Sequence, residues 1–305
     1  MEKKKNEAVI APPLPEDGVL RPTFFGRFRC RAGACAHSCC RGWEIDVDGD
    51  SAARYLACPP PFGDRLRQSL ACGEEGYSFR LTREEACPFL NREGLCELIL
   101  TLGEDALCDI CREHPRFYGA AGDLEYAGLG LSCEAAAQLL LSEKTLRFTD
   151  GETAFPLSAI LRSLTGEAAE LRFSPETGAA ELDALLRLYS LTEPIDGRWT
   201  AELSAMRADL SALCRRAEIY RRTYDRQAFD RILQYILFRR LEDLPEYGLA
   251  ALTAFARLGA QFIFCAAAAG TPLCESVRRW SEQIEYSTEN VGILLDDIIN
   301  GRSEP

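Results

Sequence analysis

Cysteines crowd the first half of the chain in a pattern that could bind metal. Eleven of the fourteen cysteines fall within residues 1–133. Nine of them form four groups, which read Cys30-x4-Cys35-x3-Cys39-Cys40, Cys87-x8-Cys96, Cys108-x2-Cys111 and Cys133. Thiolates are soft ligands that suit zinc and iron–sulfur clusters, and a fold can close the long gaps between groups. The spacing therefore favours a site in which several thiols meet at an inorganic centre.

Three interpretations of these thiols compete. Free cysteines pack well as small apolar residues, but so many in four groups make that interpretation weak. Structural zinc usually takes two close pairs such as C-x2-C, and only Cys108 and Cys111 have that spacing. The cluster of radical enzymes requires the motif C-x3-C-x2-C. Cys35 and Cys39 match its first two positions, but Gly42 occupies the third, so a standard site of this type is rejected. We therefore predict an iron–sulfur cluster of less common ligation.

Some cysteines fit this prediction less well than others. Cys39 and Cys40 are adjacent, so we expect their side chains to point apart and not to face one iron together. Cys58 and Cys72 lie outside the four groups, and we expect them to take no part in the site.

Charged and aromatic residues beside the thiols could serve a chemical step. Asp46 lies in an acidic turn that could guide an ammonium group, although a merely solvated turn has the same composition. Trp43 could stack on a cation or pack in the core. Arg112 and Arg116 could bind a carboxylate or neutralise the charge of a cluster, and ordinary ion pairs are the alternative.

Composition limits the class of protein. The chain has 305 residues, 47% of them hydrophobic, and its 35 basic and 47 acidic residues give a net charge of −12. The apolar content is enough for a real core in one large domain or two. Such an acidic chain is a poor candidate for nucleic-acid binding and is better suited to basic substrates or basic protein tails.

The apolar runs of the chain are short. Residues 8–11 are too few for the core of a secretory signal, and residues 262–269 fall short of the ~20 residues of a spanning helix. We therefore expect a cytoplasmic protein without membrane insertion. Thiols stay reduced in the cytoplasm, which favours metal or redox chemistry over a disulfide framework.

Hydrophobic periodicity predicts a mainly α fold in three parts. Residues 1–22 look like a flexible arm, residues 23–145 like a cysteine-rich module of loops and short helices around an iron–sulfur site, and residues 146–305 like an α-helical bundle on which the module packs. In the module we expect a strand at 77–81 and helices at 50–57, capped by Asp50, at 103–113, and at 133–144, capped by Ser132. In the bundle we expect helices at 157–164, 199–222, 226–242, 245–268, 272–284 and 290–300.

Five blocks of the sequence resemble the flagellin lysine-N-methylase family. They are residues 28–46, 87–116, 131–136, 235–239 and 281–290, so the resemblance runs from about residue 24 to residue 295. Part of the cysteine pattern is shared with a broader group of zinc- or iron-chelating cysteine-cluster proteins. The chain departs from the family pattern at Glu134, where proline is common, at Tyr286, where histidine is common, and in the extra thiol Cys108.

The resemblance implies methyl transfer to lysine ε-amines, with flagellin as the protein partner, S-adenosylmethionine as the donor and a 4Fe–4S cluster. It implies Asp46 and Tyr286 as catalytic residues, and Trp43, Arg112 and Arg116 as donor contacts. The metal ligands implied are Cys30, Cys35, Cys39, Cys40, Cys87, Cys96, Cys111 and Cys133. The sequence has no strand–G-x-G-x-G–helix arrangement, so a Rossmann-type donor site is not expected.

Two functions of other classes stay open beside the enzyme. The cysteine cluster alone would also fit a non-enzymatic iron–sulfur or zinc-binding protein that chelates metal or transfers electrons. It would equally fit a structural zinc protein that presents the helical bundle to partners.

Overall fold

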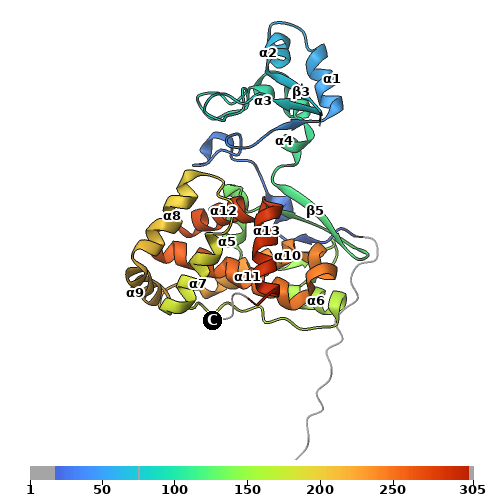
Figure 1. The fold of residues 1–305 in the computed structure, drawn as a ribbon. Helices are drawn as coiled ribbons and strands as arrows, with labels where there is room; N and C mark the ends of the chain where they lie inside the picture. Colours follow the sequence, from blue (N-terminus) through green and yellow to red (C-terminus); the bar gives the residue numbers. More distant parts are fainter. Residues whose placement is uncertain (1–17, 75, 302–305) are drawn as a thin grey trace, which may run out of the picture. The chain divides into compact units, whose positions relative to one another are not determined.

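The computed structural model describes residues 18–74 and 76–301, which form two compact units. The thiol-rich unit consists of Phe28–Phe117 and Cys133–Ala135, and the helical unit of residues 18–27, 118–132 and 136–301. Thirteen α-helices lie among the described residues, so the prediction of a mainly α fold is confirmed (Figure 1). The divisions predicted at residues 22 and 145 stay a prediction, and residues 1–17 of the predicted arm lie outside the described residues.

Short elements joined by loops make up the thiol-rich unit. Its strands are β2 (Asp46–Val47), β3 (Leu70–Gly73) and β4 (Gly76–Phe79), which form an antiparallel sheet in the order β2-β4-β3. Its helices are η2 (Ala32–Ala34), α1 (Gly49–Ala57), α2 (Phe62–Ser69), α3 (Glu97–Leu102), η3 (Glu104–Ala106) and α4 (Asp109–Glu113). The loops and helix ends between these elements carry most of the cysteines.

Several local predictions for the first half of the chain are wrong in detail. Asp48, not Asp50, caps α1, because its Oδ1 accepts a hydrogen bond from Ser51 N at 2.8 Å. The helix predicted at 103–113 is interrupted, because Leu107 and Cys108 have extended backbone conformations between η3 and α4. The Ser132 hydroxyl is buried without a hydrogen-bond partner and caps no helix. The predicted strand at 77–81 is confirmed as β4.

Three aromatic side chains form the core of the thiol-rich unit. Tyr55 stacks on Phe79 with ring centroids 5.7 Å apart, and Phe79 meets Phe89 edge-on at 5.1 Å. All three are almost fully buried, and the Tyr55 hydroxyl donates to Ala106 O at 2.6 Å. This aromatic core is the surface against which several of the thiols pack.

The helical unit holds most of the helices and two small sheets. Strands β1 (Arg21–Pro22), β7 (Phe148–Thr149) and β8 (Ala154–Phe155) form one antiparallel sheet, and β5 (Arg116–Ala121), which starts in the last residues of Phe28–Phe117, pairs with β6 (Leu124–Leu129). The α-helices are α5 (Glu134–Ser142), whose first residues belong to the thiol-rich unit, α6 (Leu157–Thr165), α7 (Ala179–Tyr189), α8 (Gly197–Ala208), α9 (Leu210–Tyr220), α10 (Arg226–Arg239), α11 (Leu244–Ala269), α12 (Leu273–Trp280) and α13 (Thr288–Ile299). Short helical turns are η1 (Phe25–Arg27), η4 (Leu241–Asp243) and the π-helical η5 (Ser281–Glu285).

Helix α11 is the central helix of this unit, and it contacts α7, α9, α10, α12 and α13 (Figure 1). The segment Leu241–Ala269 is long and apolar enough to cross a membrane, but 61% of its most apolar window is buried within the fold. That degree of burial is what the core helix of a globular unit shows. The helix exceeds the apolar run seen in the sequence because it continues through Gly259 and the buried Gln261.

Periodicity overestimates the length of two helices in this unit. The stretch 199–222 divides at Asp209, whose side chain caps α9 by accepting from Ala212 N at 2.8 Å. The stretch 272–284 is α12 followed by the π-helical η5. Single π-helical turns occur frequently at functional positions, and this one directly precedes Tyr286.

Candidate functional site

All eleven cysteines of residues 1–133 belong to the thiol-rich unit. Cys133 is the informative case. Residues 118–132 before it belong to the helical unit, whereas Cys133–Ala135 group with Phe28–Phe117. The fold thus closes the long sequence gap between Cys133 and the other thiols.

Six cysteines pack in or against the aromatic core of this unit, and we call the five that belong to the four sequence groups the inner thiols. Cys87 and Cys108 are buried, and Cys40, Cys96 and Cys111 are partly buried. All five pack within or against one hydrophobic cluster. Water is therefore largely excluded from the sulfurs on the inner side.

Backbone hydrogen bonds fix three of the inner thiols relative to one another. Cys87 N donates to Cys40 O at 2.8 Å, which ties the second cysteine block to the first. Leu90 N donates to Cys87 O at 3.1 Å, and Leu90 forms an antiparallel bridge with Cys96. These bonds set the positions of the thiols without any disulfide.

Helix α4 supplies the other two inner thiols. Cys108 is the residue before its first turn, and Cys111 lies within it. Asp109 N donates to Asp48 Oδ2 at 2.9 Å, so the aspartate that caps α1 also holds the start of α4. The two hydrogen bonds from backbone N–H groups lower the pKa of the Asp48 carboxyl to about 2, the one from Asp109 contributing most.

Four further thiols lie outside the hydrophobic cluster, and we call them the outer thiols. Cys30 and Cys39 are exposed, and Cys35 and Cys133 are partly buried. None of the four is part of the hydrophobic cluster that contains the inner thiols. The outer thiols therefore face a wetter environment.

Glu134, the residue after Cys133, contacts the loop that carries the outer thiols Cys30 and Cys35. Its Oε2 accepts from Ala36 N at 2.7 Å, and its Oε1 pairs with Arg31 at 3.2 Å. These contacts bring Cys133 to the loop that carries Cys35. Burial, with the charges of Glu134 and Cys133, raises the pKa of the Cys35 thiol. Sequence reasoning missed this role of Glu134, whose one signal was its departure from the family pattern.

Two pairs of thiols influence each other's protonation in this unit, Cys39 with Cys40 and Cys108 with Cys111. The neighbouring thiol lowers the pKa of Cys40 and of Cys108 to about 7, and it raises the pKa of Cys39 and of Cys111. The expectation that Cys39 and Cys40 point apart stays a prediction. Cys40 and Cys108 come closest to the thiolate form that binds metals.

The other inner thiols hold their protons more tightly. Burial raises the pKa of Cys87 to about 12, and the charges of Cys40, Cys96 and Cys108 add to it. Burial likewise raises the pKa of Cys96. A metal that binds these sulfurs must displace the protons, so binding at such a site depends on pH.

The thiols among the described residues do not have the spacing of a site for a single metal ion. No group of three or more His, Cys, Asp or Glu side chains within 18–74 and 76–301 has the spacing of a single-ion site. A tetrahedral zinc site with Zn–S bonds of about 2.3 Å brings its sulfurs to about 3.8 Å from one another. A 4Fe–4S cluster holds four thiolates on separate irons and spreads them more widely. The soft donors present fit such a cluster in kind, and the iron–sulfur site stays a prediction.

The remaining thiols and histidines have structural or peripheral positions. Cys58 ends α1 and packs against the aromatic core, while Cys72 is exposed in β3. Burial lowers the pKa of His114 to about 4, and its Nε2 has no hydrogen-bond partner among the described residues. His114 is therefore neutral at physiological pH.

The predicted donor contacts lie in the thiol-rich unit. Trp43 is partly buried. Arg112 donates to Leu107 O at 2.7 Å and pairs with Asp109 at 3.0 Å. Arg116 donates to Arg112 O at 3.2 Å and stacks its guanidinium 5.5 Å from the centroid of the Phe28 ring. Both arginines thus already have partners within their own unit.

The two predicted catalytic residues belong to different units. Asp46 is exposed in β2, opposite Ser78. Tyr286 in the helical unit is 37% exposed, and its ring covers the Arg239 guanidinium at 4.7 Å. A Cβ atom at Gly130 would collide with the Tyr286 hydroxyl, so a glycine is required there.

Arg239, whose guanidinium the Tyr286 ring covers, also forms a buried ion pair with Glu285. Arg239 Nε lies 3.8 Å from Glu285 Oε1, and both side chains are almost fully buried. Ser281 Oγ donates to Glu285 Oε2 at 2.5 Å across the π-helical turn. Sequence reasoning missed this pair, because the partners lie 46 residues apart and each stands in an ordinary helical pattern.

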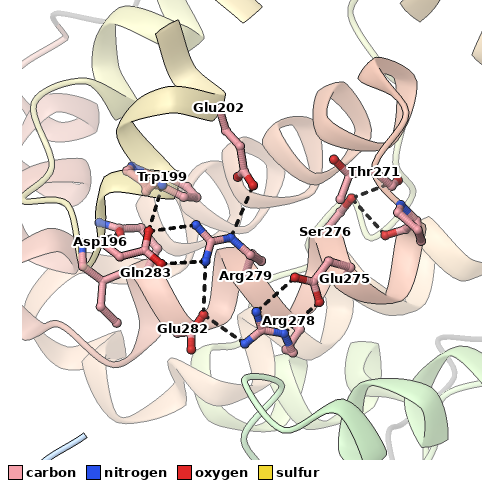
Figure 2. A network of polar contacts seen from close by, with 12 residues as sticks. Asp196, Trp199, Glu202, Thr271, Glu275, Ser276, Arg278, Arg279, Glu282 and Gln283 are labelled. Carbon is pink, nitrogen blue, oxygen red and sulfur yellow. Dashed lines mark hydrogen bonds and ion pairs between the residues drawn. The ribbon is translucent and has the colours of Figure 1, made fainter. Parts of the chain in front are cut away.

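Most polar residues of the C-terminal block hold the fold of the helical unit. Figure 2 shows Arg279 forming two 3.1 Å bonds to Asp196, which also caps α8 through Trp199 N. Arg278 lies between Glu275 and Glu282 at 2.8 and 2.9 Å (Figure 2). The bonds from Arg279 to Asp196 fasten α12 to the start of α8, whereas Arg278 pairs with residues of α12 and η5.

Gln283 and Asn290 fix the loop that precedes α8. The Gln283 side chain accepts from Ile195 N and donates to Glu193 O, at 2.8 and 2.5 Å. Asn290 accepts from Glu193 N at 2.8 Å and donates to Gln283 O at 2.9 Å. These two amides of the C-terminal block are fully used in structure, which leaves the partly exposed Tyr286 as its candidate for chemistry.

Comparisons with known proteins give three relatives from Salmonella. The chain is 30% identical over 147 residues to the lysine-N-methylase of Salmonella typhimurium and 29% identical over 147 residues to that of Salmonella choleraesuis. Each match covers 44% of this chain and 37% of the relative, so the match spans little more than a third of those enzymes. The flagellar biosynthetic protein FliU of Salmonella muenchen is 26% identical over 155 residues, covering 49% of this chain and 92% of that protein. No protein-family model and no solved structure matches.

Proposed function

We propose that this chain, a relative of the lysine-N-methylases, transfers methyl groups from S-adenosylmethionine to lysine ε-amines of flagellin, with an iron–sulfur cluster bound by its thiol-rich unit. The main observation that supports this proposal is the similarity to proteins named lysine-N-methylase. The name of the flagellar relative supports flagellin as the protein substrate. We further propose that the protein acts in the cytoplasm, where its thiols stay reduced.

The reaction requires a neutral amine. A lysine ammonium has a reference pKa of about 10.4, so it must lose a proton before its nitrogen can attack. Transfer forms the bond between nitrogen and the methyl carbon and breaks the methyl carbon–sulfur bond of the donor. The methylated nitrogen then carries the positive charge that the sulfur carried before.

Asp46 and Tyr286 belong to different units, and each is proposed to serve the substrate separately. Asp46 is exposed and can attract a lysine ammonium, as can the chain's net charge of −12. Tyr286 presents a hydroxyl held in place by Gly130 and Arg239, which suits it to hydrogen-bond the amine.

The donor supplies an electrophilic methyl group when bound. Trp43 is proposed to stack on its sulfonium, and Arg112 and Arg116 to pair with its carboxylate. Because each arginine already has partners, donor binding would exchange some of those contacts for the carboxylate. No step of the transfer is assigned to these three residues.

Methylation of purified flagellin tests the function. The whole chain, prepared without oxygen and with its metal, should add methyl groups to flagellin lysines in the presence of S-adenosylmethionine, read by mass spectrometry. Tyr286→Phe should lower the initial rate about 100-fold, the scale of a lost acid–base contact, whereas Tyr224→Phe, whose ring packs on Phe229 in the helical unit, should not. No methyl incorporation by the metal-loaded wild type would refute the proposal.

A non-enzymatic metal-binding protein is the second candidate. The observation that favours it is the segregation of all eleven thiols in a unit of short elements. Calorimetry with S-adenosylmethionine discriminates between the two, because a chelator or electron carrier should bind no donor. Binding that weakens at least tenfold in Arg116→Ala would support the enzyme.

A further inference from the structure

We propose that the loop between α7 and α8, residues 190–196, docks a lysine-bearing segment of the protein substrate that carries apolar residues beside the lysine. We call residues 190–196 the docking loop. This inference rests on the proposed function, because it takes Tyr286 as the residue that meets the lysine amine.

The docking loop lies at the surface, yet its backbone is held by two buried side chains. Gln283 accepts from Ile195 N at 2.8 Å and donates to Glu193 O at 2.5 Å. Asn290 accepts from Glu193 N at 2.8 Å and donates to Glu193 O at 3.0 Å. Both amide side chains are almost fully buried, so a displaced loop would leave them without these partners at a cost in free energy. The loop is therefore ordered before any partner binds.

The same two amides tie the docking loop to the chain on both sides of Tyr286. Gln283 precedes Tyr286 by three residues and Asn290 follows it by four, and the loop and all three residues belong to the helical unit. Three residues of chain span at most about 11 Å. A substrate segment of a few residues can therefore contact the loop while its lysine meets Tyr286.

The docking loop exposes apolar side chains. Leu191 and Ile195 are 64% and 40% exposed. Thr192 between them is buried, and its hydroxyl donates to Tyr189 O at 2.8 Å. Because the loop is already ordered, covering Leu191 and Ile195 with a partner gains hydrophobic free energy with little loss of conformational entropy. Apolar residues of a partner therefore fit this loop.

The charge at the surface beside the docking loop is negative. In the network of Figure 2 the Arg279 side chain is 5% exposed, whereas its partners Asp196 and Glu202 are 41% and 37% exposed. The cation thus lies inside and the two carboxylates outside. Glu193 in the loop and Glu289 in the first turn of α13 are exposed as well. A partner that covers the loop meets carboxylates beside apolar side chains.

A lysine-bearing segment matches both features of this surface. The lysine ammonium suits the carboxylates, and its aliphatic stem packs on apolar side chains. A second copy of this chain, with its net charge of −12, would be repelled by the same carboxylates. The occupant that the surface favours is therefore the substrate and not another copy of the protein.

Binding of purified monomeric flagellin to the whole chain, measured by calorimetry without a methyl donor, tests the docking loop. Leu191→Ser/Ile195→Ser should weaken binding about tenfold, because both apolar contacts are lost. Ile219→Ser is the matched control and should bind as the wild type does, since Ile219 is equally exposed but lies on α9. No binding by the wild-type chain, or equal affinities of the two variants, would overturn the proposal.

A second pair of variants tests the charge of the surface. Glu193→Gln/Glu289→Gln should weaken flagellin binding about threefold at low ionic strength and reduce its dependence on salt. Glu152→Gln/Glu167→Gln removes the same charge from two other exposed positions of the helical unit and should have little effect. Equal losses in the two double variants would show that only the net charge matters and would contradict docking at the loop.

Binding and methylation together separate this inference from the proposed function. A wild-type chain that binds flagellin through the docking loop but adds no methyl groups would refute the proposed function and leave the docking surface standing. Methylation of flagellin by a chain whose Leu191→Ser/Ile195→Ser variant binds as tightly as the wild type would refute the docking surface and leave the function standing.

Discussion

The helical unit and the thiol-rich unit reach a folded core by different means. In the helical unit, Tyr189, Trp199 and Phe262 pack with ring centroids 4.3–6.3 Å apart, and the central helix α11 is flanked by five others. In the thiol-rich unit, three aromatic rings and aliphatic side chains from short helices and strands form one hydrophobic cluster, and six cysteines pack in or against it. Burial of apolar area is enough to explain order in the first unit.

This difference indicates that the thiol-rich unit depends on something beyond its side chains. The thiol-rich unit consists only of residues 28–117 and 133–135, and its helices and strands are at most nine residues long, so its single hydrophobic cluster has little regular structure to support it. All fourteen cysteines are free thiols, so disulfides do not fill that role here. Metal would supply the missing free energy, and the following experiments test the contrast.

Metal removal should have the largest effect, and it should fall on one unit. Binding of a structural thiolate metal contributes about 10–16 kcal/mol to the folding of small domains. Chelation of the whole chain without oxygen should therefore raise hydrogen exchange throughout residues 28–117. Peptides of α7–α13 should keep their protection. Protection of residues 28–117 that survives complete metal loss would show that the contrast is wrong.

A substitution that creates a large cavity in the helical unit should have the opposite effect, because it should destabilise that unit and leave the metal content unchanged. Trp280 is fully buried, and its Nε1 donates to the Tyr189 hydroxyl at 2.8 Å. Trp280→Ala should lower the free energy of unfolding of that unit by about 3–5 kcal/mol, measured by urea titration of the helical circular dichroism. The metal content should stay at the wild-type value, and Trp280→Phe should cost less. A parallel loss of metal would argue that the units do not fold separately.

Removing one cap should have an intermediate effect on the thiol-rich unit. Asp48 caps α1 and accepts from Asp109 N at the start of α4, whereas Asp50 has neither role. Asp48→Ala should cost about 1–2 kcal/mol and lower the affinity for metal, because α4 carries two inner thiols. Asp50→Ala is the control and should stay close to wild type. Equal effects of the two substitutions would count against the assigned cap.

Acidic pH should lower the free energy of unfolding of the thiol-rich unit through His114, and this is the smallest of the four predicted effects. The folded pKa is about 4 against about 6.5 when unfolded, so only the unfolded chain takes up a proton between those values. Stability should therefore fall as the pH drops, by about 1 kcal/mol between pH 7.5 and pH 5.5. His114→Gln should lose this part of the pH dependence in chemical unfolding, while His37→Gln should keep it. An unchanged pH profile in His114→Gln would show that this imidazole does not titrate as its burial requires.

Local patterns in the sequence predicted the helical class and most helix positions well. Stretches such as 226–242 and 290–300 carry a 3.6-residue apolar period, and they appear as α10 and α13. Periodicity failed where one or two residues override it: Asp209 divides one predicted helix by capping the next, and the extended residues Leu107 and Cys108 divide another. Such breaks depend on a single backbone conformation, which a periodic average does not resolve.

The sequence by itself determined that the thiols are concentrated in the first 133 residues, that the rest is mainly helical, and that the chain is similar to proteins named lysine-N-methylase. Residue type, period and local spacing carry that information. Only the tertiary structure decided that Cys133 joins the earlier thiols and that Glu134 holds it there. It also decided that Arg239 and Glu285 pair beneath Tyr286. The physical reason is that contacts between distant residues depend on how the chain closes on itself, which no local pattern encodes.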